Sequence, residues 1–167
     1  LLASIQTFTE NDETTFVAEI PNFVKAAEND IFRNTQIPDL RKTDTSLTLT
    51  ISSEYLTLPS DFLASYSFAV TTGGDHYWLL NKEPDFIRES YPARLTLGRP
   101  RYYAVFDDTR FIMAPTPDVA YTTELYYFYE PTSIVTGSTS WLGTNAPNAL
   151  LYGSLLHAYV FMKGDPD

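Results

Sequence analysis

Two histidines, two adjacent aspartates and a glycine pair are the residues whose types could support catalysis or ligand binding. His76 lies in a Gly-rich stretch, and His157 lies far from it near the end of the chain. Neither histidine is flanked by other ligands at metal-binding spacing, so we predict no metal site. A small hydrolase would need the two histidines to meet in space, and we keep this as the weaker of two alternative functions.

The aspartates and glycines fit turns better than active sites. Asp107-Asp108 follows a strand-like run, and adjacent residues of a turn point apart into water. Gly73-Gly74 lacks the strand, helix and lysine context of a phosphate-binding loop, so it indicates a hairpin tip. We therefore predict no catalytic residue and no cofactor, and we expect a non-enzymatic protein.

Aromatic residues are the main feature of the predicted strand that covers residues 121–129. Its odd and even positions line opposite faces, and both faces carry aromatic residues. We expect both faces to be covered, one of them by another molecule, and we select Tyr127 and Tyr129 as interface candidates. A carbohydrate-binding module that uses this Tyr-rich sheet is the alternative function, because tyrosine rings also stack on sugars.

The elements around these residues indicate one α+β domain, with helices of both terminal parts packed with antiparallel β hairpins over about residues 46–130. We predict helices within residues 11–44, with one helix ending before Pro21 and another starting there. The following ranges complete the prediction: a β-rich part at 46–131 with strands at 46–50 and 55–58 and a short helix near 84–91, a loop at 132–145, and a helix at 146–163.

The last helix and the loop before it supply further interface candidates. The helix is apolar around most of its circumference, and Tyr159 lies in the second of its two apolar stripes. Trp141 and Leu142 stand in the otherwise polar loop. Trp141 either fills the core of its own subunit or docks on a neighbouring protein, and the sequence leaves both possibilities open.

The charge balance restricts the partners. The net charge is −10, which argues against a protein that binds nucleic acid through phosphate contacts. Five of the seven arginines lie within residues 88–110, where they form either a solvated strand edge or a rim that meets the acidic face of a neighbour. Arg99 and Arg101 are the interface candidates in this group.

Two further features concern the chain as a whole. It contains no cysteine and no apolar run long enough for a membrane span, so we predict no disulfide and no membrane association. It begins at Leu1 rather than Met and ends at Asp167 directly after a helix-stop signal, Gly164 with Asp165-Pro166. We expect a piece of a longer protein that is truncated at both ends.

The order of several short motifs resembles the head–tail adaptor, or connector, proteins of tailed bacteriophages. The motifs spread over most of the chain and consist of IPNFVKAAE from Ile20, LTLPSDF from Leu56, GRPRYY from Gly98, APTPD from Ala114, LYY from Leu125, EP at Glu130, WL at Trp141, NALLYG from Asn148 and AYVFMK from Ala158.

This resemblance implies a structural virion protein of the phage neck, at the head–tail junction. Copies would form a homo-oligomeric ring, commonly of twelve, between the capsid portal and a tail or nozzle protein. The ring would continue the DNA channel used in genome packaging and DNA ejection, and duplex DNA would pass through without specific binding. Such a protein is made in the cytoplasm of the bacterial host. The family usually continues beyond the point where this chain ends.

Overall fold

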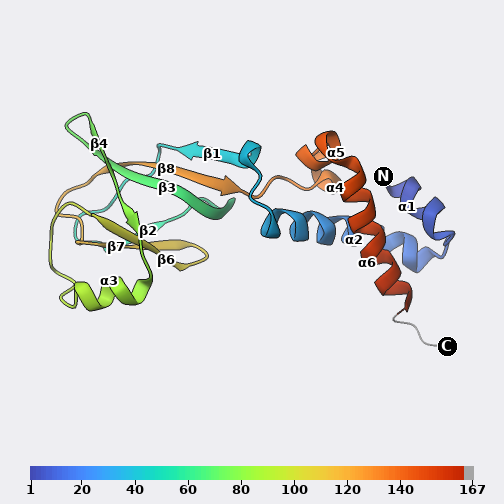
Figure 1. Ribbon diagram of the computed structural model, residues 1–167, viewed down its shortest axis with the longest axis horizontal. Coiled ribbons are helices and arrows are strands. Elements are labelled where there is room, and N and C mark those ends of the chain that lie inside the picture. The colour runs from blue at the N-terminus through green and yellow to red at the C-terminus, as the bar shows by residue number, and fades with distance from the viewer. Residues whose placement is uncertain (164–167) are drawn as a thin grey trace. The chain divides into compact units, whose positions relative to one another are not determined.

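The computed structural model describes residues 1–163, which fold as two compact units (Figure 1). The helical unit combines residues 1–36 with the segment that follows Pro131, and the β unit comprises Ile37–Glu130. The α+β class predicted from the sequence is confirmed, with six α-helices and two four-stranded sheets in the described residues. The predicted stop signal at Gly164, Asp165 and Pro166 lies outside these residues.

The helical unit contains five helices whose apolar sides face one another. Phe16, Ile20 and Val24 are buried along one side of the longest helix, and Leu150 and Ala158 are buried on the last one. The helices are α1 (Leu2–Thr9), α2 (Thr14–Asn34), α4 (Ile134–Gly137), α5 (Trp141–Asn145) and α6 (Pro147–Lys163).

Pro21 does not separate two helices, so the predicted break there is wrong. It lies inside the continuous helix α2. A proline in a helix removes one backbone donor, which leaves the carbonyl four residues earlier without its usual partner. Ile20 and Phe23, on either side of the proline, are both buried, and their packing keeps the helix in one piece. The N-terminal ten residues, where the sequence shows no periodicity, also contain a helix, α1.

The segment 132–145, predicted as a loop, forms the two short helices α4 and α5. The Ser133 and Ser140 side chains each accept a hydrogen bond from a backbone N–H of the turn that follows, which caps both helices. A Cβ atom on Gly143 would lie 2.7 Å from Cδ1 of Ile134, so α4 and α5 approach as closely as a glycine permits. Local capping and this contact supply the order that the Ser, Thr and Gly composition did not predict.

The β unit is built from two sheets that lie face to face (Figure 1). The first sheet has the order β1-β8-β3-β4, and the second has the order β2-β7-β6-β5 with β5 and β6 parallel. The elements are η1 (Pro38–Leu40), β1 (Arg41–Asp44), β2 (Tyr55–Thr57), β3 (Phe62–Thr72), β4 (Asp75–Trp78), β5 (Leu80–Asn81), α3 (Pro84–Ser90), β6 (Tyr102–Asp107), β7 (Arg110–Ala114) and β8 (Thr122–Tyr129).

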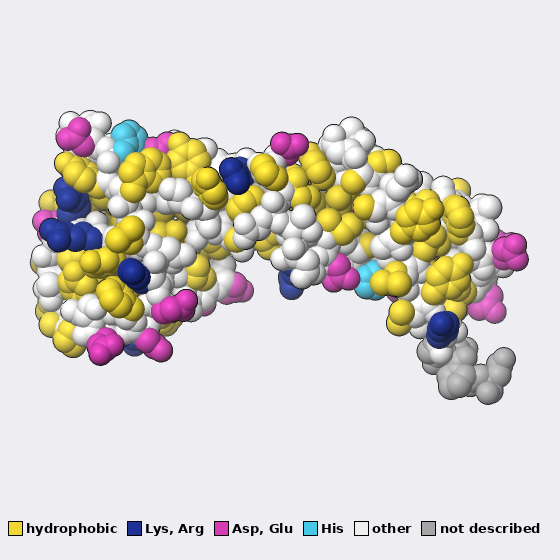
Figure 2. Space-filling view, in the orientation of Figure 1, with side chains coloured by type: hydrophobic (Ala, Val, Ile, Leu, Met, Phe, Trp, Pro, Cys, Tyr) yellow, Lys and Arg dark blue, Asp and Glu magenta, His cyan; other side chains and the backbone are white. Residues whose placement is uncertain are grey.

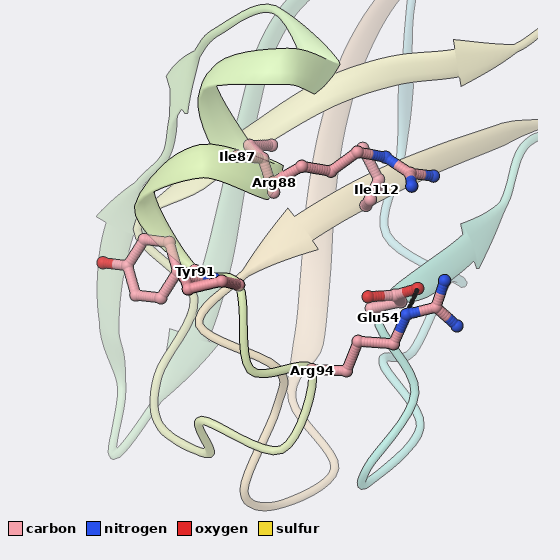
Figure 3. A pocket seen from close by; sticks show the side chains of 7 residues that line it. Glu54, Ile87, Arg88, Tyr91, Arg94 and Ile112 are labelled. Atoms are coloured by element: carbon pink, nitrogen blue, oxygen red, sulfur yellow. Dashed lines mark ion pairs between the residues drawn. The ribbon is translucent and has the colours of Figure 1, made fainter.

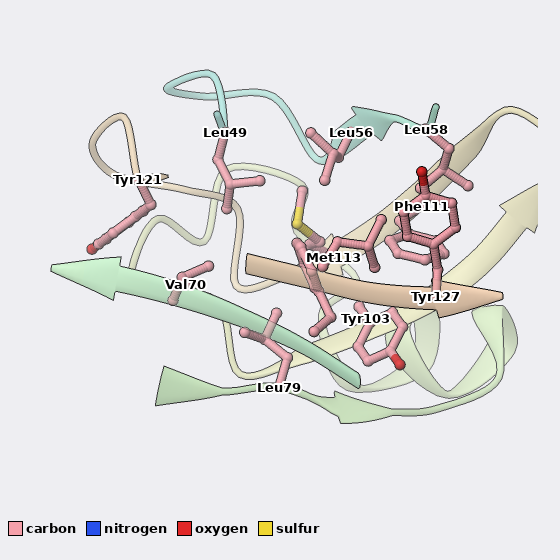
Figure 4. Close-up of a cluster of buried hydrophobic side chains, with 12 residues drawn as sticks. Leu49, Leu56, Leu58, Val70, Leu79, Tyr103, Phe111, Met113, Tyr121 and Tyr127 are labelled. Carbon is pink, nitrogen blue, oxygen red and sulfur yellow. The ribbon is translucent and has the colours of Figure 1, made fainter. Parts of the chain in front are cut away.

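The main core of the β unit lies between the two sheets (Figure 4). Phe68 and Leu125 come from the first sheet, Phe111 and Met113 come from the second, and all four side chains are almost completely buried. Helix α3 covers the other side of the second sheet, where Ile87 packs in a smaller apolar cluster. The second sheet is therefore covered on both faces within the unit.

The predicted strand at residues 46–50 is replaced by an irregular segment, and the observed pairings join strands that are distant in the sequence. Residues 46–50 do not form a strand that pairs with 55–58. Strand β1 at Arg41–Asp44 pairs with β8, and β2 pairs with β7. The segment after β1 continues irregularly along β8, where the Leu49 N–H donates to the Tyr121 carbonyl at 2.8 Å. Strand β8 does not pair with the β6–β7 hairpin that precedes it in the chain. It pairs with β3 and β1 in the other sheet.

The predicted turns are confirmed. Gly73 and Gly74 connect β3 to β4 with φ values of 61° and 89°, a region that favours glycine. In the β6–β7 hairpin the Asp107 carboxylate accepts a hydrogen bond from the Thr109 N–H at 2.9 Å. Helix α3 begins at Pro84, as the sequence predicts.

Candidate interaction surfaces

Helix α6 exposes an uninterrupted apolar stripe on the side opposite its buried residues. We call the four residues the outer stripe: Tyr152, Leu156, Tyr159 and Val160, which are 63%, 66%, 46% and 65% exposed. Their spacing of four, three and one residues places them on one side of the helix. Apart from His157, the only charged residue of α6 is Lys163. Lys163, seven residues after Leu156, lies at the C-terminal end of the same side, and the stripe before it carries no charge. Such an exposed apolar helix side is typical of a surface that another molecule covers.

The opposite side of α6 is fixed against α2. A Cβ atom on Gly153 would lie 3.1 Å from Cβ of Ala27, so the two helices approach closely at this point. On this buried side the Asn11 amide lies 3.7 Å from Sδ of Met162, and at the edge of the outer stripe the Tyr159 hydroxyl donates to the Phe8 carbonyl at 3.3 Å. These contacts determine which side of α6 faces outward, and apolar side chains gather over this unit in the space-filling view (Figure 2).

Strand β8 directs its odd-numbered residues into the core of the β unit. Tyr127 is 1% exposed, and its hydroxyl donates to Asp61 at 2.9 Å, while Lys42 forms an ion pair with the same carboxylate at 2.7 Å. Burial, followed by the hydrogen bond to Asp61, raises the pKa of Tyr127 to about 12. Tyr129 is half-buried at the end of the same face.

The even-numbered residues of β8 lie on the opposite face of the first sheet, which we call the aromatic face. Tyr66 and Trp78 are 57% and 53% exposed there. The Trp78 ring lies 5.9 Å from that of Tyr126, and Tyr66 makes an edge contact with Phe128 at 6.3 Å. The Arg41 guanidinium lies 4.1 Å from the centre of the Tyr66 ring. Trp, Tyr and Arg are the residue types that most often dominate binding at protein interfaces.

A polar group borders these aromatic rings. Glu124 lies 2.8 Å from Nδ1 of His76 and accepts a hydrogen bond from the Tyr126 hydroxyl at 2.6 Å. That hydrogen bond raises the pKa of Tyr126. The contacts hold Tyr126 in place beside Trp78, and they pair Glu124 with a neighbouring imidazole. Arg41 takes part in no ion pair within residues 1–163, so it can pair with a carboxylate of another molecule.

The arginines of residues 88–110 do not form one continuous patch of free charge. Arg110 is paired with Asp107 at 2.7 Å, and Arg99 stacks on the Tyr77 ring with its guanidinium carbon 3.6 Å from the ring centre. Arg101 is exposed. Arg88 and Arg94 line a cavity of about 130 Å³ (Figure 3).

This cavity has limited capacity for a ligand. Glu54 also lines it and lies 3.7 Å from Nε of Arg94. Because a water molecule occupies about 30 Å³ in the liquid, the cavity has room for a few waters or one small side chain. Its charge is partly balanced by Glu54, so it does not resemble a site for a polyanion.

The two histidines lie in different units and have separate partners. His76 is in the β unit beside Glu124, and His157 is in the helical unit, 2.9 Å from Asp30. Among residues 1–163, no group of three or more His, Cys, Asp or Glu side chains is arranged to hold a metal ion.

Comparison with known proteins assigns the chain to a family. The model of the SU10 adaptor protein family matches residues 1–167. The chain belongs to this family. It is a family of phage head–tail adaptors, so the protein is a structural component of the virion, as the motif order in the sequence indicated. A search of curated proteins found no match.

Membership in an adaptor family agrees with surfaces that contact other proteins. The family implies association with portal and tail proteins and assembly of several copies. Over the described residues, the adaptor has no helix with the length and apolar character needed to cross a bilayer.

The interface candidates predicted from the sequence lie in three environments of the adaptor: buried, half-buried and exposed. Leu142 is buried in the helical unit and Tyr127 in the core of the β unit, whereas Trp141, Tyr129 and Arg99 are half-buried. Arg101 and Tyr159 are exposed. Their roles as contacts stay predictions, and the exposed ones are the candidates that a partner can reach without rearrangement of the subunit.

Sequence reasoning missed most residues of the aromatic face. Alternation along 121–129 showed that β8 has two aromatic sides but did not show which one faces the second sheet. Trp78 and Tyr66 belong to strands whose outward positions depend on the β3–β8 register, including a bulge between Ser65 and Ser67. Three members of the outer stripe, Tyr152, Leu156 and Tyr159, were visible in the sequence as a second apolar stripe, whereas Val160 and the exposure of the stripe were not.

Proposed function

We propose that this adaptor forms a closed ring of copies between the capsid portal and the tail, continues the DNA channel, and provides the platform for tail attachment. A ring of twelve is the number that the family resemblance implies. The ring belongs to the neck of the virion, and its subunits are made in the cytoplasm of the bacterial host. The observation that supports assembly most directly is the outer stripe of α6.

The outer stripe favours assembly for an energetic reason. Burying an exposed leucine or valine side chain contributes about 1.5–3 kcal/mol when burial is complete. Leu156 and Val160 are each exposed by about two thirds, and two tyrosines extend the same surface. In an isolated subunit this apolar surface is exposed to water, whereas a contact between subunits of the ring buries it.

The charge of the chain suits a channel through which DNA moves. Holding duplex DNA requires clustered Lys and Arg that release counterions from phosphates, and the net charge here is −10. Arg110 is already paired within the chain, and Glu54 accompanies Arg94. We expect purified rings not to shift duplex DNA at physiological salt. Tight, salt-sensitive binding would contradict this part of the proposal.

Electron microscopy of the purified protein and of phage particles tests the proposal. We expect rings in the purified sample and density for the adaptor between portal and tail in particles. In a phage that carries Leu156→Glu, heads should fill with DNA but remain without tails. Leu95→Glu is the matched control, because Leu95 is an exposed leucine of the β unit outside the aromatic face. Monomers of the wild-type chain that are absent from the particle neck would overturn the proposal.

A further inference from the structure

We propose that in the ring the outer stripe of α6 in one copy packs against the aromatic face of the β unit in the next copy. This inference rests on the proposed ring and identifies its subunit contact. The partner of each surface is therefore a second copy of this chain.

The symmetry of a ring requires two different surfaces on each subunit. When one patch contacts the same patch of another copy, a two-fold dimer closes and no further copy can be added. A ring instead needs a donor patch and a different acceptor patch, both carried by every copy. The outer stripe lies in the helical unit and the aromatic face lies in the β unit, so the chain carries two distinct apolar surfaces.

The two surfaces are complementary in side-chain type. The outer stripe offers Leu156 and Val160, and the aromatic face offers the exposed rings of Trp78 and Tyr66. Aromatic rings that cover aliphatic side chains bury large areas at small conformational cost, because the rings have few rotatable bonds. A glycan is a poorer occupant, since the Trp78 and Tyr126 rings contact each other at an interplanar angle of 37° and form no flat platform.

Charges beside each surface are also complementary. The linker between α1 and α2 contains Glu10, Asp12 and Glu13, which form no ion pair within the described residues. The linker follows Phe8, whose carbonyl accepts a hydrogen bond from the hydroxyl of the stripe residue Tyr159, so it adjoins the C-terminal end of the outer stripe. The three carboxylates there outnumber the one cation at this end of α6, Lys163. On the aromatic face the free charge is Arg41, which is fixed over Tyr66.

Apolar contact alone does not complete such an interface. A stable interface buries about 800 Å² on each partner, which is more than four side chains of one helix supply. Inclusion of the acidic linker and Arg41 enlarges the contact and determines its direction. The C-terminal end of α6 then faces β1 of the next copy, where Arg41 and Thr43 lie.

Cross-linking between single-cysteine variants tests the contact, because the natural chain contains no cysteine. Val160→Cys lies on the outer stripe, and Thr43→Cys pairs with Tyr126 across the aromatic face. The two variants are assembled together and treated with a short bis-maleimide linker. We expect a cross-linked dimer from the mixture and none from either variant alone, and the double variant should give a ladder of linked copies.

Control variants separate failure of the contact from failure of the ring. Asp108→Cys, in the β6–β7 turn, replaces Thr43→Cys as the matched control and should give no dimer with Val160→Cys. Dimers from Val160→Cys alone would show that α6 meets α6 and would overturn the inference. Rings that are visible by microscopy but give no mixed dimer would also overturn it, while the proposed function would stand. Absence of rings would contradict the proposed function itself.

A charge exchange provides an independent test. Arg41→Glu should raise the protein concentration needed for half-assembly by roughly five-fold or more, because it places like charges together at the contact. Combining Arg41→Glu with Glu13→Arg and Asp12→Arg should restore assembly, which a purely structural role of Arg41 would not explain. Unchanged assembly of Arg41→Glu, or failure of the combined variant to recover, would contradict the pairing.

Discussion

Helix α6 and strand β8 are both apolar on two opposite sides, but the fold treats their second sides differently. The outer stripe of α6 is exposed along four residues. The outer side of β8 is partly covered by its own neighbours, since Arg41 and Tyr66 lie over Phe128, which is buried. A helix presents one side of a single element, whereas a sheet surrounds each side chain with adjacent strands. The helix is therefore the surface that depends more on assembly.

The largest expected difference is in the free energy of unfolding, between truncation of a core residue and truncation of a residue in the outer stripe. Phe111→Ala should lower the free energy of unfolding by about 3–5 kcal/mol, because it leaves a cavity between the two sheets. Leu156→Ala should change the unfolding of the isolated subunit by less than about 0.5 kcal/mol, since its side chain is exposed. Chemical denaturation of both variants measures these values. A large loss for Leu156→Ala would show that the subunit itself covers the stripe.

Breaking the contact between α2 and the segment 132–145 should have the next largest effect on the free energy of unfolding. Glu28 is 2% exposed, its Oε1 accepts from the Ile134 N–H at 3.0 Å, and its Oε2 has no hydrogen-bond partner within residues 1–163. Glu28→Ala should lower the free energy of unfolding by about 1–3 kcal/mol, because it leaves that partly buried N–H without its acceptor. Glu28→Gln keeps a side-chain acceptor for the Ile134 N–H and should cost less. Amide exchange at Ile134 reports the contact, and equal losses in both variants would contradict this account.

Removing one hydroxyl from the core side of β8 should have a smaller effect. Tyr127→Phe deletes the hydrogen bond to Asp61 and should cost about 1 kcal/mol. Tyr129→Phe on the same strand is the control, because its hydroxyl forms no hydrogen bond to another residue among those described, and we expect almost no change. Thermal unfolding compares the pair, and a larger loss for the Tyr129 variant would be inconsistent with the described core.

The smallest expected effect concerns the exposed β6–β7 turn. Hydrogen bonds from Arg110 and then Thr109 lower the pKa of Asp107 from its usual 3.8 to about 2. Because the folded-state pKa is depressed, the contribution to stability is present above pH 3.8 and is lost as the pH falls toward 2. In an NMR titration, Arg110→Gln should raise the pKa of Asp107 toward its usual value. An unchanged pKa would show that the ion pair is not formed in solution.

Helix α6 and strand β8 also differ in how much of their structure the sequence predicts. Features governed by neighbouring residues were predicted correctly, including the Gly73-Gly74 turn, the start of α3 at Pro84 and the start of α6. The continuity of α2 through Pro21 and the pairing of β8 with β3 were not, because both depend on packing between distant segments. The same limit applies to the surfaces, since alternation identifies two sides of a strand and only the partner sheet decides which side is open.

The central claim, that exposed apolar surface on α6 assembles the ring, is tested most directly by the mass of the particle in solution. Sedimentation of the wild-type chain and of Leu156→Glu should be compared at the same micromolar concentration, with thermal unfolding of each as a check on folding. We predict a closed multi-copy particle for the wild type and a folded monomer with an unchanged melting temperature for the variant. A wild-type monomer at every concentration, or a Leu156→Glu particle of the same mass as the wild type, would contradict the claim.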